Sequence, residues 1–235
     1  MTRAAHRETA QADILAAAAA IIARHGYHGT SMRDLAKSTG RGLSSFYTYF
    51  ASKEALLFAL QSRAFVALIE AAEAAAAATE HPDRRLYAVI LNHVRYFATH
   101  NDVMRVLVQE AKVLPARQRK QVRALKERYF AMVRDLVHEL GSDRAGAFAA
   151  GVNRQEVERV TYSLFGMLNW VWAWYEPKQH GTARDVARTI HATIHRALTG
   201  RAPARPSWTA VDAALDRVAL RSLISPQPNG SSSGG

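Results

Sequence analysis

The sequence predicts an all-α protein with a small N-terminal head of three helices and a larger helical body. Apolar residues recur at spacings of three and four along most of the chain, and the alternation typical of half-buried strands is absent. Helix-capping residues, glycines and prolines separate these periodic segments. Apolar residues make up 49% of the 235 residues, which is enough to build a sizeable core.

The composition excludes several classes of protein. The chain has no cysteine, so disulfides and cysteine-ligated metals are excluded. No run approaches the roughly 20 consecutive apolar residues of a membrane helix. Glu8 and Asp13 interrupt the alanine-rich start, which favours an amphipathic helix over a signal peptide. We therefore expect a cytoplasmic protein, and its net charge of +11 favours a polyanionic partner such as nucleic acid or a phosphorylated ligand.

The head begins with a helix that ends at Gly26, a common C-terminal stop. Its apolar residues share one face: Ile14, Ala18, Ile21 and Ile22. Thr30 or Ser31 is expected to cap a short helix that stops at Gly40. A second short helix follows Gly42 and runs to about residue 49.

The body reads as six further helices that begin at a capping residue, a proline or an apolar stripe. The first is a long helix that begins after the capping Ser52. The others are expected over residues 82–100, 103–111, 115–140, 153–176 and 182–198. From residue 201 the composition changes. "RAPARP" predicts a linker, the segment after it one possible further helix, and "PQPNGSSSGG" a flexible tail.

The stretch "GRGLSSFYTYFASKE" at residues 40–54 places rings beside hydroxyls in a short space. Two short helices joined by a glycine-bearing turn, after a longer helix, form a helix-turn-helix layout. Phe46 and Phe50 would hold the second short helix to the head, while small polar side chains would enter the DNA major groove. A cation and backbone N–H groups at the next helix would hold a phosphate. The expected DNA-binding residues are Thr30, Ser31, Arg41, Ser44, Ser45, Tyr47, Thr48, Tyr49 and Lys53.

Residues 26–57, "GYHGTSMRDLAKSTGRGLSSFYTYFASKEALL", resemble the head of the TetR (tetracycline repressor) family of bacterial transcription regulators. The resemblance rests on the Leu-Ala pair at 35–36, the turn glycine at 40, the tyrosine at 47 and the Phe-x-x-Lys-Glu exit at 50–54. Arg41 and Gly42 depart from the family pattern, which usually has a small aliphatic residue and a Ser/Thr helix cap there. The resemblance implies a body that dimerises and holds a ligand pocket.

The helix expected over residues 153–176 is apolar on nearly its whole circumference. One face carries Val160, Leu164, Met167, Leu168, Val171, Trp174 and Tyr175, and another carries Tyr162, Phe165, Asn169 and Trp172. Such a helix must be covered on both sides, so we expect one side to pack on the core and the other on a second subunit. A homodimer also suits DNA reading, because two heads can meet half-sites one DNA turn (~34–36 Å) apart.

Two segments, "GMLNWVWAWYEP" and "VLVQEAKVLPARQRKQV", resemble the body of TetR-type repressors that respond to acyl-CoA thioesters of fatty-acid or steroid-ring degradation. Such a ligand needs an apolar slot and cations for its phosphates. The expected ligand-binding residues are Met104, Leu107, Glu110, Tyr129, Phe165, Asn169, Trp170 and Trp174, with phosphates met by Arg105, Arg119, Arg123 or Arg128. The alternatives stay open that these aromatics are core, that Glu110 pairs with an arginine, and that the basic run at 117–128 is a solvated face or assists DNA contact.

The chain has no G-x-x-x-x-G-K-[ST] or H-E-x-x-H motif, and its G-x-S-x-G match at residues 230–234 lies in the serine- and glycine-rich tail, without the strand-to-helix turn that this signature requires. His191 and His195 lie one helical turn apart, but no third metal ligand lies near them in the sequence. We therefore expect no enzyme, no metal and no cofactor.

The expected organisation is a DNA-binding domain at 1–52, a ligand-binding and dimerisation domain at 53–200, and a linker and tail at 201–235. The expected function is a ligand-responsive repressor that a small hydrophobic effector, such as an acyl-CoA, releases from a palindromic operator. One alternative is a repressor of efflux or aromatic metabolism that responds to a drug-like or aromatic ligand. Another is a DNA-bound interaction protein without a small-molecule switch.

Overall fold

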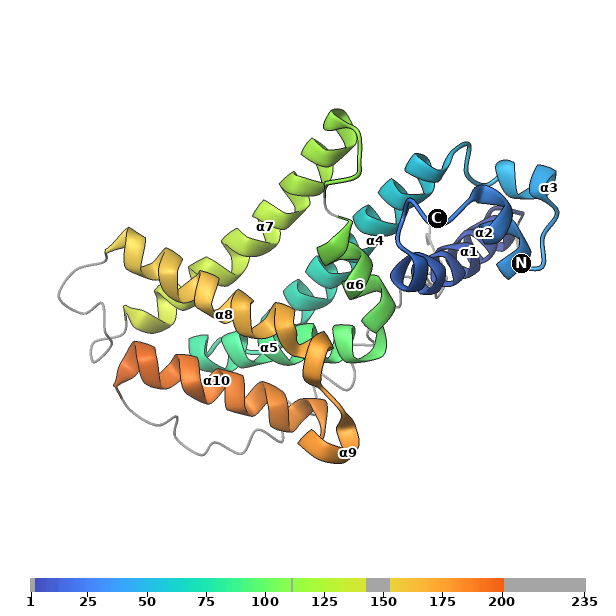
Figure 1. Ribbon diagram of the computed structural model, residues 1–235. Coiled ribbons are helices and arrows are strands. Elements are labelled where there is room, and N and C mark those ends of the chain that lie inside the picture. Colours follow the sequence, from blue (N-terminus) through green and yellow to red (C-terminus); the bar gives the residue numbers. More distant parts are fainter. Residues whose placement is uncertain (1–2, 111, 143–152, 201–235) are drawn as a thin grey trace, which may run out of the picture.

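The computed structural model describes residues 3–110, 112–142 and 153–200, and over these residues it contains ten helices and no strand (Figure 1). The prediction of an all-α fold is confirmed. The linker, possible helix and tail expected at 201–235 lie outside the described residues.

The head consists of α1 (Arg3–His25), α2 (Met32–Ser38) and α3 (Leu43–Tyr47). Gly26 follows α1 with φ +73°, a conformation that glycine adopts without steric cost. Ser31 and Asp34 form a reciprocal capping box at the start of α2. Gly42 precedes α3 and supplies no side-chain cap, so this short helix depends on packing for its position. Helix α3 ends at Tyr47, two residues before the end predicted at about residue 49.

The body consists of α4 (Lys53–Ala77), α5 (Pro82–Thr99), α6 (Asn101–Gln109), α7 (Ala116–Gly141), α8 (Arg154–Trp174), α9 (Pro177–His180) and α10 (Ala183–Thr199). The Ser52 side chain caps α4, and Thr182 with Asp185 forms the expected capping box at α10. The short α9 lies in a stretch that the sequence pattern assigns to a connection.

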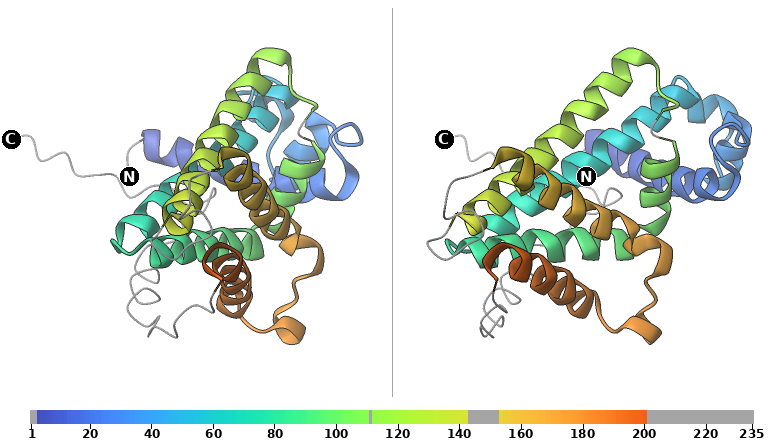
Figure 2. Two further views of the ribbon diagram at one scale, coloured as in Figure 1. Left: turned by 90° about the vertical axis from the view of Figure 1, so that its left-hand side faces the viewer. Right: turned by 60° about the vertical axis from the view of Figure 1, so that its left-hand side comes forward.

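Helix α5 is the centre of the body. All its residues from Leu86 to Val94 are buried, because α4, α7, α8 and α10 pack around it. Helix α4 begins against the head, where it contacts α1, and runs on through the body, so the two parts share one apolar core (Figure 2).

By length and composition α4 could cross a membrane, since it carries an 18-residue window of mean hydropathy 1.6. Of that window, 61% is buried inside this fold. Burial of that extent is what a core helix of a helical body shows.

Candidate nucleic-acid interface and ligand cavity

Helix α3 directs its phenylalanines inward and its hydroxyls outward. Phe46 is fully buried and Phe50 is 6% exposed, which fixes α3 on the head. Ser44, Ser45 and Tyr47 are exposed, with the Tyr47 residue at 47%. Short polar side chains on an exposed helix face can reach base edges and phosphates in a major groove.

Ser31 and Thr48 are exposed as well, but their hydroxyls already make local hydrogen bonds. Ser31 Oγ accepts from the Asp34 N–H at 3.2 Å, and Thr48 Oγ1 donates to the Ser45 carbonyl at 2.6 Å. An Arg7 nitrogen on α1 donates to the Thr48 carbonyl at 3.1 Å. This places a cation beside the exposed end of α3 that the sequence pattern did not suggest.

Arg41 and Tyr49 pack on each other beside α3. The guanidinium carbon of Arg41 lies 5.1 Å from the centroid of the Tyr49 ring, within the range of a cation–π contact. Both residues are partly buried. Their contact joins the turn before α3 to the residues just after this helix, and DNA contact by either residue remains a prediction.

The structure corrects two of the predicted DNA contacts, because their polar atoms point into the head. Thr30 is 2% exposed, and its Oγ1 donates to the Gly26 carbonyl at 2.9 Å. Lys53 Nζ donates to the carbonyls of Tyr27 at 2.8 Å and Thr30 at 2.7 Å. It also lies 4.2 Å from the centroid of the Tyr27 ring. Thr30 is a packing residue, and Lys53 positions the turn between α1 and α2.

Glu110, expected at the ligand, instead joins the body to the head. Its Oε1 accepts from the Tyr27 N–H at 2.9 Å, and its backbone carbonyl accepts from Gln61 Nε2 at 3.1 Å. The Tyr27 hydroxyl donates to Glu54 at 3.0 Å. Burial, and then the acceptor Glu54, raise the pKa of Tyr27. Glu110 is not among the cavity residues, so its predicted ligand contact is corrected.

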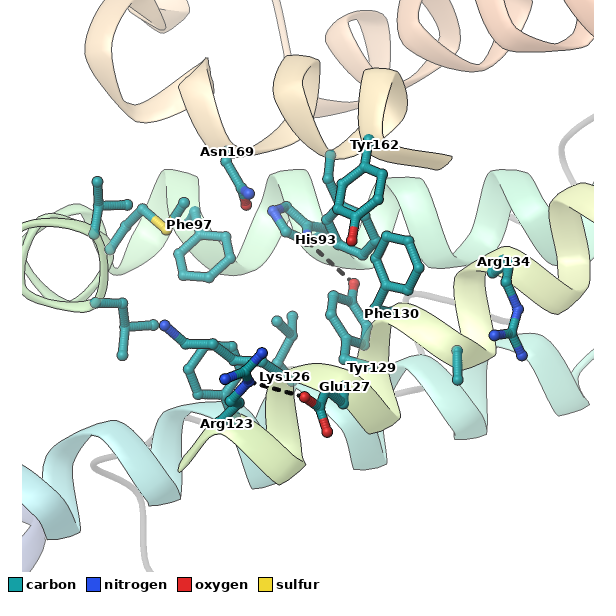
Figure 3. Close-up of a pocket in the computed structure, with 17 residues that line it drawn as sticks. His93, Phe97, Arg123, Lys126, Glu127, Tyr129, Phe130, Arg134, Tyr162 and Asn169 are labelled. Atoms are coloured by element: carbon teal, nitrogen blue, oxygen red, sulfur yellow. Dashed lines mark hydrogen bonds and ion pairs between the residues drawn. The ribbon is translucent and has the colours of Figure 1, made fainter. Parts of the chain in front are cut away.

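A cavity of about 740 Å³ lies inside the body, lined by α4 to α8 (Figure 3). Pockets that enclose small molecules commonly measure ~300–1,000 Å³. Five of the predicted ligand residues line it: Met104, Leu107, Tyr129, Phe165 and Asn169. Further apolar walls come from Phe65, Leu68, Phe97 and Phe130. The cavity can therefore enclose an apolar group.

The buried interior of the cavity contains one pair of polar side chains. His93 Nδ1 lies 3.1 Å from the hydroxyl of Tyr129, and the two residues are 2% and 3% exposed. Burial lowers the pKa of His93 to about 3, so its ring is neutral near neutral pH. Burial likewise raises the pKa of Tyr129 above its ordinary value.

Cations lie along the α7 wall of the same cavity. Lys126 is partly buried, with Nζ 5.4 Å from the centroid of the Phe65 ring, and burial lowers its pKa. Arg123 is exposed and pairs with Glu127 at 3.0 Å, and Arg134, the third cation of the lining, pairs with Asp135 at 2.7 Å. An anionic group would find positive charge at this wall.

The structure corrects the assignment of Trp170 and Trp174. They are 61% and 42% exposed on the outside of α8 and do not line the cavity. Along that outer face lie only exposed residues: Tyr162, Ser163, Gly166, Asn169, Trp170, Ala173 and Trp174. A Cβ at Gly166 would meet no atom within 4 Å. This α8 face leaves room for close approach by another helix.

Of the four arginines expected at phosphates, only Arg123 lines the cavity. Arg105 lies over the Trp172 ring at 5.9 Å, Arg119 donates to the Leu114 carbonyl at 3.5 Å, and Arg128 pairs with Glu73 at 2.6 Å. These three side chains have protein partners outside the cavity, so their predicted role is corrected.

Sequence reasoning missed His93 and Lys126 as cavity residues. His93 interrupts an otherwise apolar helix, which is a weak signal because a lone histidine is common in cores. Lys126 belongs to the row Arg123, Lys126, Phe130 and Arg134 at helical spacing, where charged and aromatic side chains mix on one face. This mixture of charged and aromatic residues on one helix face is the sequence signal that could have predicted Lys126 as a cavity residue.

The histidine pair on α10 meets a carboxylate from α5. Asp83 Oδ1 lies 2.9 Å from His191 Nε2 and 3.4 Å from His195 Nε2. Over the described ranges, no group of three or more His, Cys, Asp or Glu side chains is suited to hold a metal. The cluster instead fastens the start of α5 to α10.

Comparison with known families gives two matches. Residues 14–60 match the family described as bacterial regulatory proteins of the tetR family. Residues 79–198 match the tetracyclin repressor-like C-terminal domain. No curated protein sequence matches the chain significantly.

Solved structures resemble the chain over most of its length. A TetR-family transcriptional regulator from Bordetella parapertussis is 29% identical, with a TM-score of 0.71 over 78% of this chain and 93% of that chain. The TetR-family regulator PfmR from Thermus thermophilus is 30% identical, with a TM-score of 0.67 over 78% and 97%. AibR in complex with isovaleryl coenzyme A and operator DNA is 21% identical, with a TM-score of 0.67 over 78% and 97%.

Proposed function

Because this chain belongs to the TetR family of bacterial transcriptional regulators, we propose that it is a dimeric repressor of a palindromic operator. An effector in the body cavity releases it from the DNA. The observation that carries the proposal is the pairing of an outward-facing α3 with a largely apolar cavity, open to solvent, in one chain. As a regulator of chromosomal genes it works in the cytoplasm, without enzymatic activity.

The DNA-reading surface consists of the exposed side chains of α3 and its flanks. Ser44, Ser45, Tyr47 and Thr48 supply hydroxyls, while Arg7 and Arg41 supply charge next to them. Phosphate contacts set the register, and contacts with base edges set the sequence preference. In this division of the chain, residues 1–52 bind DNA and residues 53–200 bind the effector and the second subunit.

A second copy of the chain covers the exposed α8 face. That face combines the rings of Tyr162, Trp170 and Trp174 with Gly166, over which another helix can approach closely. Clustered exposed aromatic residues are typical of protein interfaces. Asn169 and Tyr162 belong both to this face and to the cavity wall. The effector site and the proposed dimer interface are therefore adjacent.

Effector binding releases DNA only if the effector favours a state whose heads no longer match the operator. A physical connection exists. Met104 and Leu107 on α6 line the cavity, and Glu110 at the end of α6 accepts the Tyr27 N–H of the head. A ligand that displaces α6 therefore displaces the turn before α2.

The effector class that fits best is an acyl-CoA. The apolar walls suit an acyl chain, and Arg123, Lys126 and Arg134 suit phosphates. AibR, which shares this fold, was solved with isovaleryl coenzyme A and operator DNA. A drug-like or aromatic ligand is the second candidate, because six phenylalanine and tyrosine side chains line the cavity: Phe65, Phe97, Tyr129, Phe130, Tyr162 and Phe165.

A mobility shift on the DNA upstream of the chain's own gene tests the proposal, titrated with CoA, acyl-CoAs and the matching free acids. Release by acyl-CoAs alone supports the effector class. Release by aromatic compounds alone favours the second candidate, and release by nothing leaves a DNA-bound interaction protein. Tyr47→Ala should abolish the shift without changing thermal stability, since Tyr47 is exposed. Lys178→Ala on α9, far from the head (Figure 1), should leave the shift unchanged.

A further inference from the structure

The cavity contains one buried polar atom with no protein partner. His93 Nε2 is inaccessible to solvent and has no hydrogen-bond partner among the described residues. The residue is 2% exposed and lines the cavity. A buried polar group left without a partner costs about 1–3 kcal/mol, so such groups usually meet one.

The surroundings of His93 fix the orientation of its ring. Phe97 and Phe165 contact it edge to face at centroid distances of 4.7 and 6.3 Å. Tyr129 lies nearly parallel to it at 5.9 Å and bonds to Nδ1. Three aromatic neighbours hold the ring in this orientation, so over the described residues Nε2 stays unpaired in a side chain that lines the cavity. An effector oxygen reaches it by displacing the atoms that cover it.

The hydrogen bond with Tyr129 sets the role of Nε2. Among the described residues the structure shows no other acceptor for the Tyr129 hydroxyl, and we assign this hydroxyl as the donor and His93 Nδ1 as the acceptor. The neutral imidazole then carries its proton on Nε2, because one ring nitrogen donates when the other accepts. Nε2–H is therefore a hydrogen-bond donor without an acceptor in the described part of the chain.

The other polar groups of the cavity complete a pattern. The Asn169 side chain points from α8 toward His93 (Figure 3). Lys126 is partly buried and Arg123, which pairs with Glu127, is exposed, so the cations lie on the solvent side of the cavity. The cavity thus offers a buried neutral donor and an outer cationic wall, with aromatic and aliphatic surfaces between them.

We propose that His93 is the specificity-determining residue of the cavity and donates a hydrogen bond to a carbonyl oxygen of the effector. The effector is an amphiphile with this carbonyl in its buried part and its anionic end at the α7 cations. The inference rests on the proposed function, in that the cavity holds the effector. It adds that a ligand of the same shape and charge without the carbonyl binds poorly.

The test compares acyl-CoAs with S-alkyl-CoA thioethers, which lack only the carbonyl oxygen. Butyryl-, octanoyl- and lauroyl-CoA and their thioethers are titrated into the full-length protein by calorimetry. For the best chain length the acyl-CoA should bind about tenfold more tightly, the value of one buried hydrogen bond. In His93→Phe this ratio should fall to about one, whereas His93→Gln, which keeps a donor near Nε2, should retain several-fold preference.

Tyr96→Phe is the matched control. The Tyr96 hydroxyl is also buried without a protein partner among the described residues and lies on α5, but Tyr96 does not line the cavity. This variant should keep the wild-type ratio. Circular dichroism and thermal unfolding check that each variant folds.

A wild-type ratio near one overturns the inference without any variant. A tenfold ratio that persists in His93→Phe also overturns it, as does failure of every probe to bind. A mobility shift on the same preparation distinguishes failure of the proposed function from failure of the proposed role of His93. Operator release by an acyl-CoA with a ratio near one leaves the proposed function standing and removes only the role of His93.

Discussion

Replacing Lys53 by methionine separates two roles for this residue, a phosphate contact and a support for the head. The substitution keeps the aliphatic stem and removes the ammonium, which donates to the Tyr27 carbonyl at 2.8 Å and the Thr30 carbonyl at 2.7 Å. A hydrogen bond to a charged group contributes about 1.5–3 kcal/mol. Because the Lys53 side chain is only partly buried, water can take over part of these hydrogen bonds when the ammonium is removed. We therefore expect a loss of about 2–4 kcal/mol in local stability.

Hydrogen exchange of the amides at residues 27–31 measures this loss directly. A local loss of about 2 kcal/mol corresponds to roughly 30-fold faster exchange. Operator affinity should fall because α2 loses its fixed position, while the slope of log affinity against log salt stays the same, since no phosphate contact disappears. Lys37→Met, an exposed lysine of α2, should leave the exchange of the turn unchanged.

The opposite pattern would refute this reasoning. If the exchange of the turn were unchanged and the salt slope fell by about one, Lys53 would neutralise a phosphate, as the sequence pattern predicted. The two carbonyl contacts would then be incidental to stability.

Three further predictions concern the α3 cap, the α5 anchor and the dimer face. Gly42→Ser should stabilise the head by about 0.5–1.5 kcal/mol in thermal unfolding, because Gly42 has extended backbone, open space at Cβ and no side chain to cap α3. Gly40→Ala, at φ +65°, should destabilise it. Asp83→Asn should cost about 1–2 kcal/mol near neutral pH. Burial alone raises the pKa of Asp83, but the His191 hydrogen bond and the nearby positive charges outweigh it and hold the pKa below 3.8. The cost measured by urea unfolding should therefore be full above that value and vanish as pH falls through the lowered pKa. Trp170→Glu should give monomers in sedimentation with an intact fold, because Trp170 is exposed in the single chain, whereas Val66→Glu, on the exposed side of α4, should stay dimeric.

Helix positions could be predicted because their signals are local in the sequence. Ser52 before α4, Thr182 with Asp185 at α10 and Gly200 after it act within one turn of the chain. The helix-turn-helix head was equally predictable, since Phe46 and Phe50 are spaced to face inward while the hydroxyls between them face outward. These features depend on neighbours that the sequence itself places side by side.

The cavity and its lining residues depend on contacts between segments that are distant in the sequence. The periodicity of a helix shows which faces are apolar, but not which other helix each face meets. Helix α8 is apolar on two sides, and only packing decided that Phe165 faces the cavity while Trp170 and Trp174 face outward. Glu110 was predicted to contact the ligand because it is a lone acid in an apolar segment. Its actual partner, the Tyr27 N–H, lies 83 residues away and could not be identified from the sequence.

The sequence by itself therefore determined the all-α class, the approximate places of the main helices and the head that marks the family. Only the tertiary structure decided that Lys53 and Thr30 serve the head and that His93 and Lys126 belong to the cavity. The physical reason is that caps and periodicity are set by adjacent residues, whereas a cavity is set by which faces of α4 to α8 meet. The charge and hydrogen-bonding groups of that cavity, and so its ligand preference, follow from this packing.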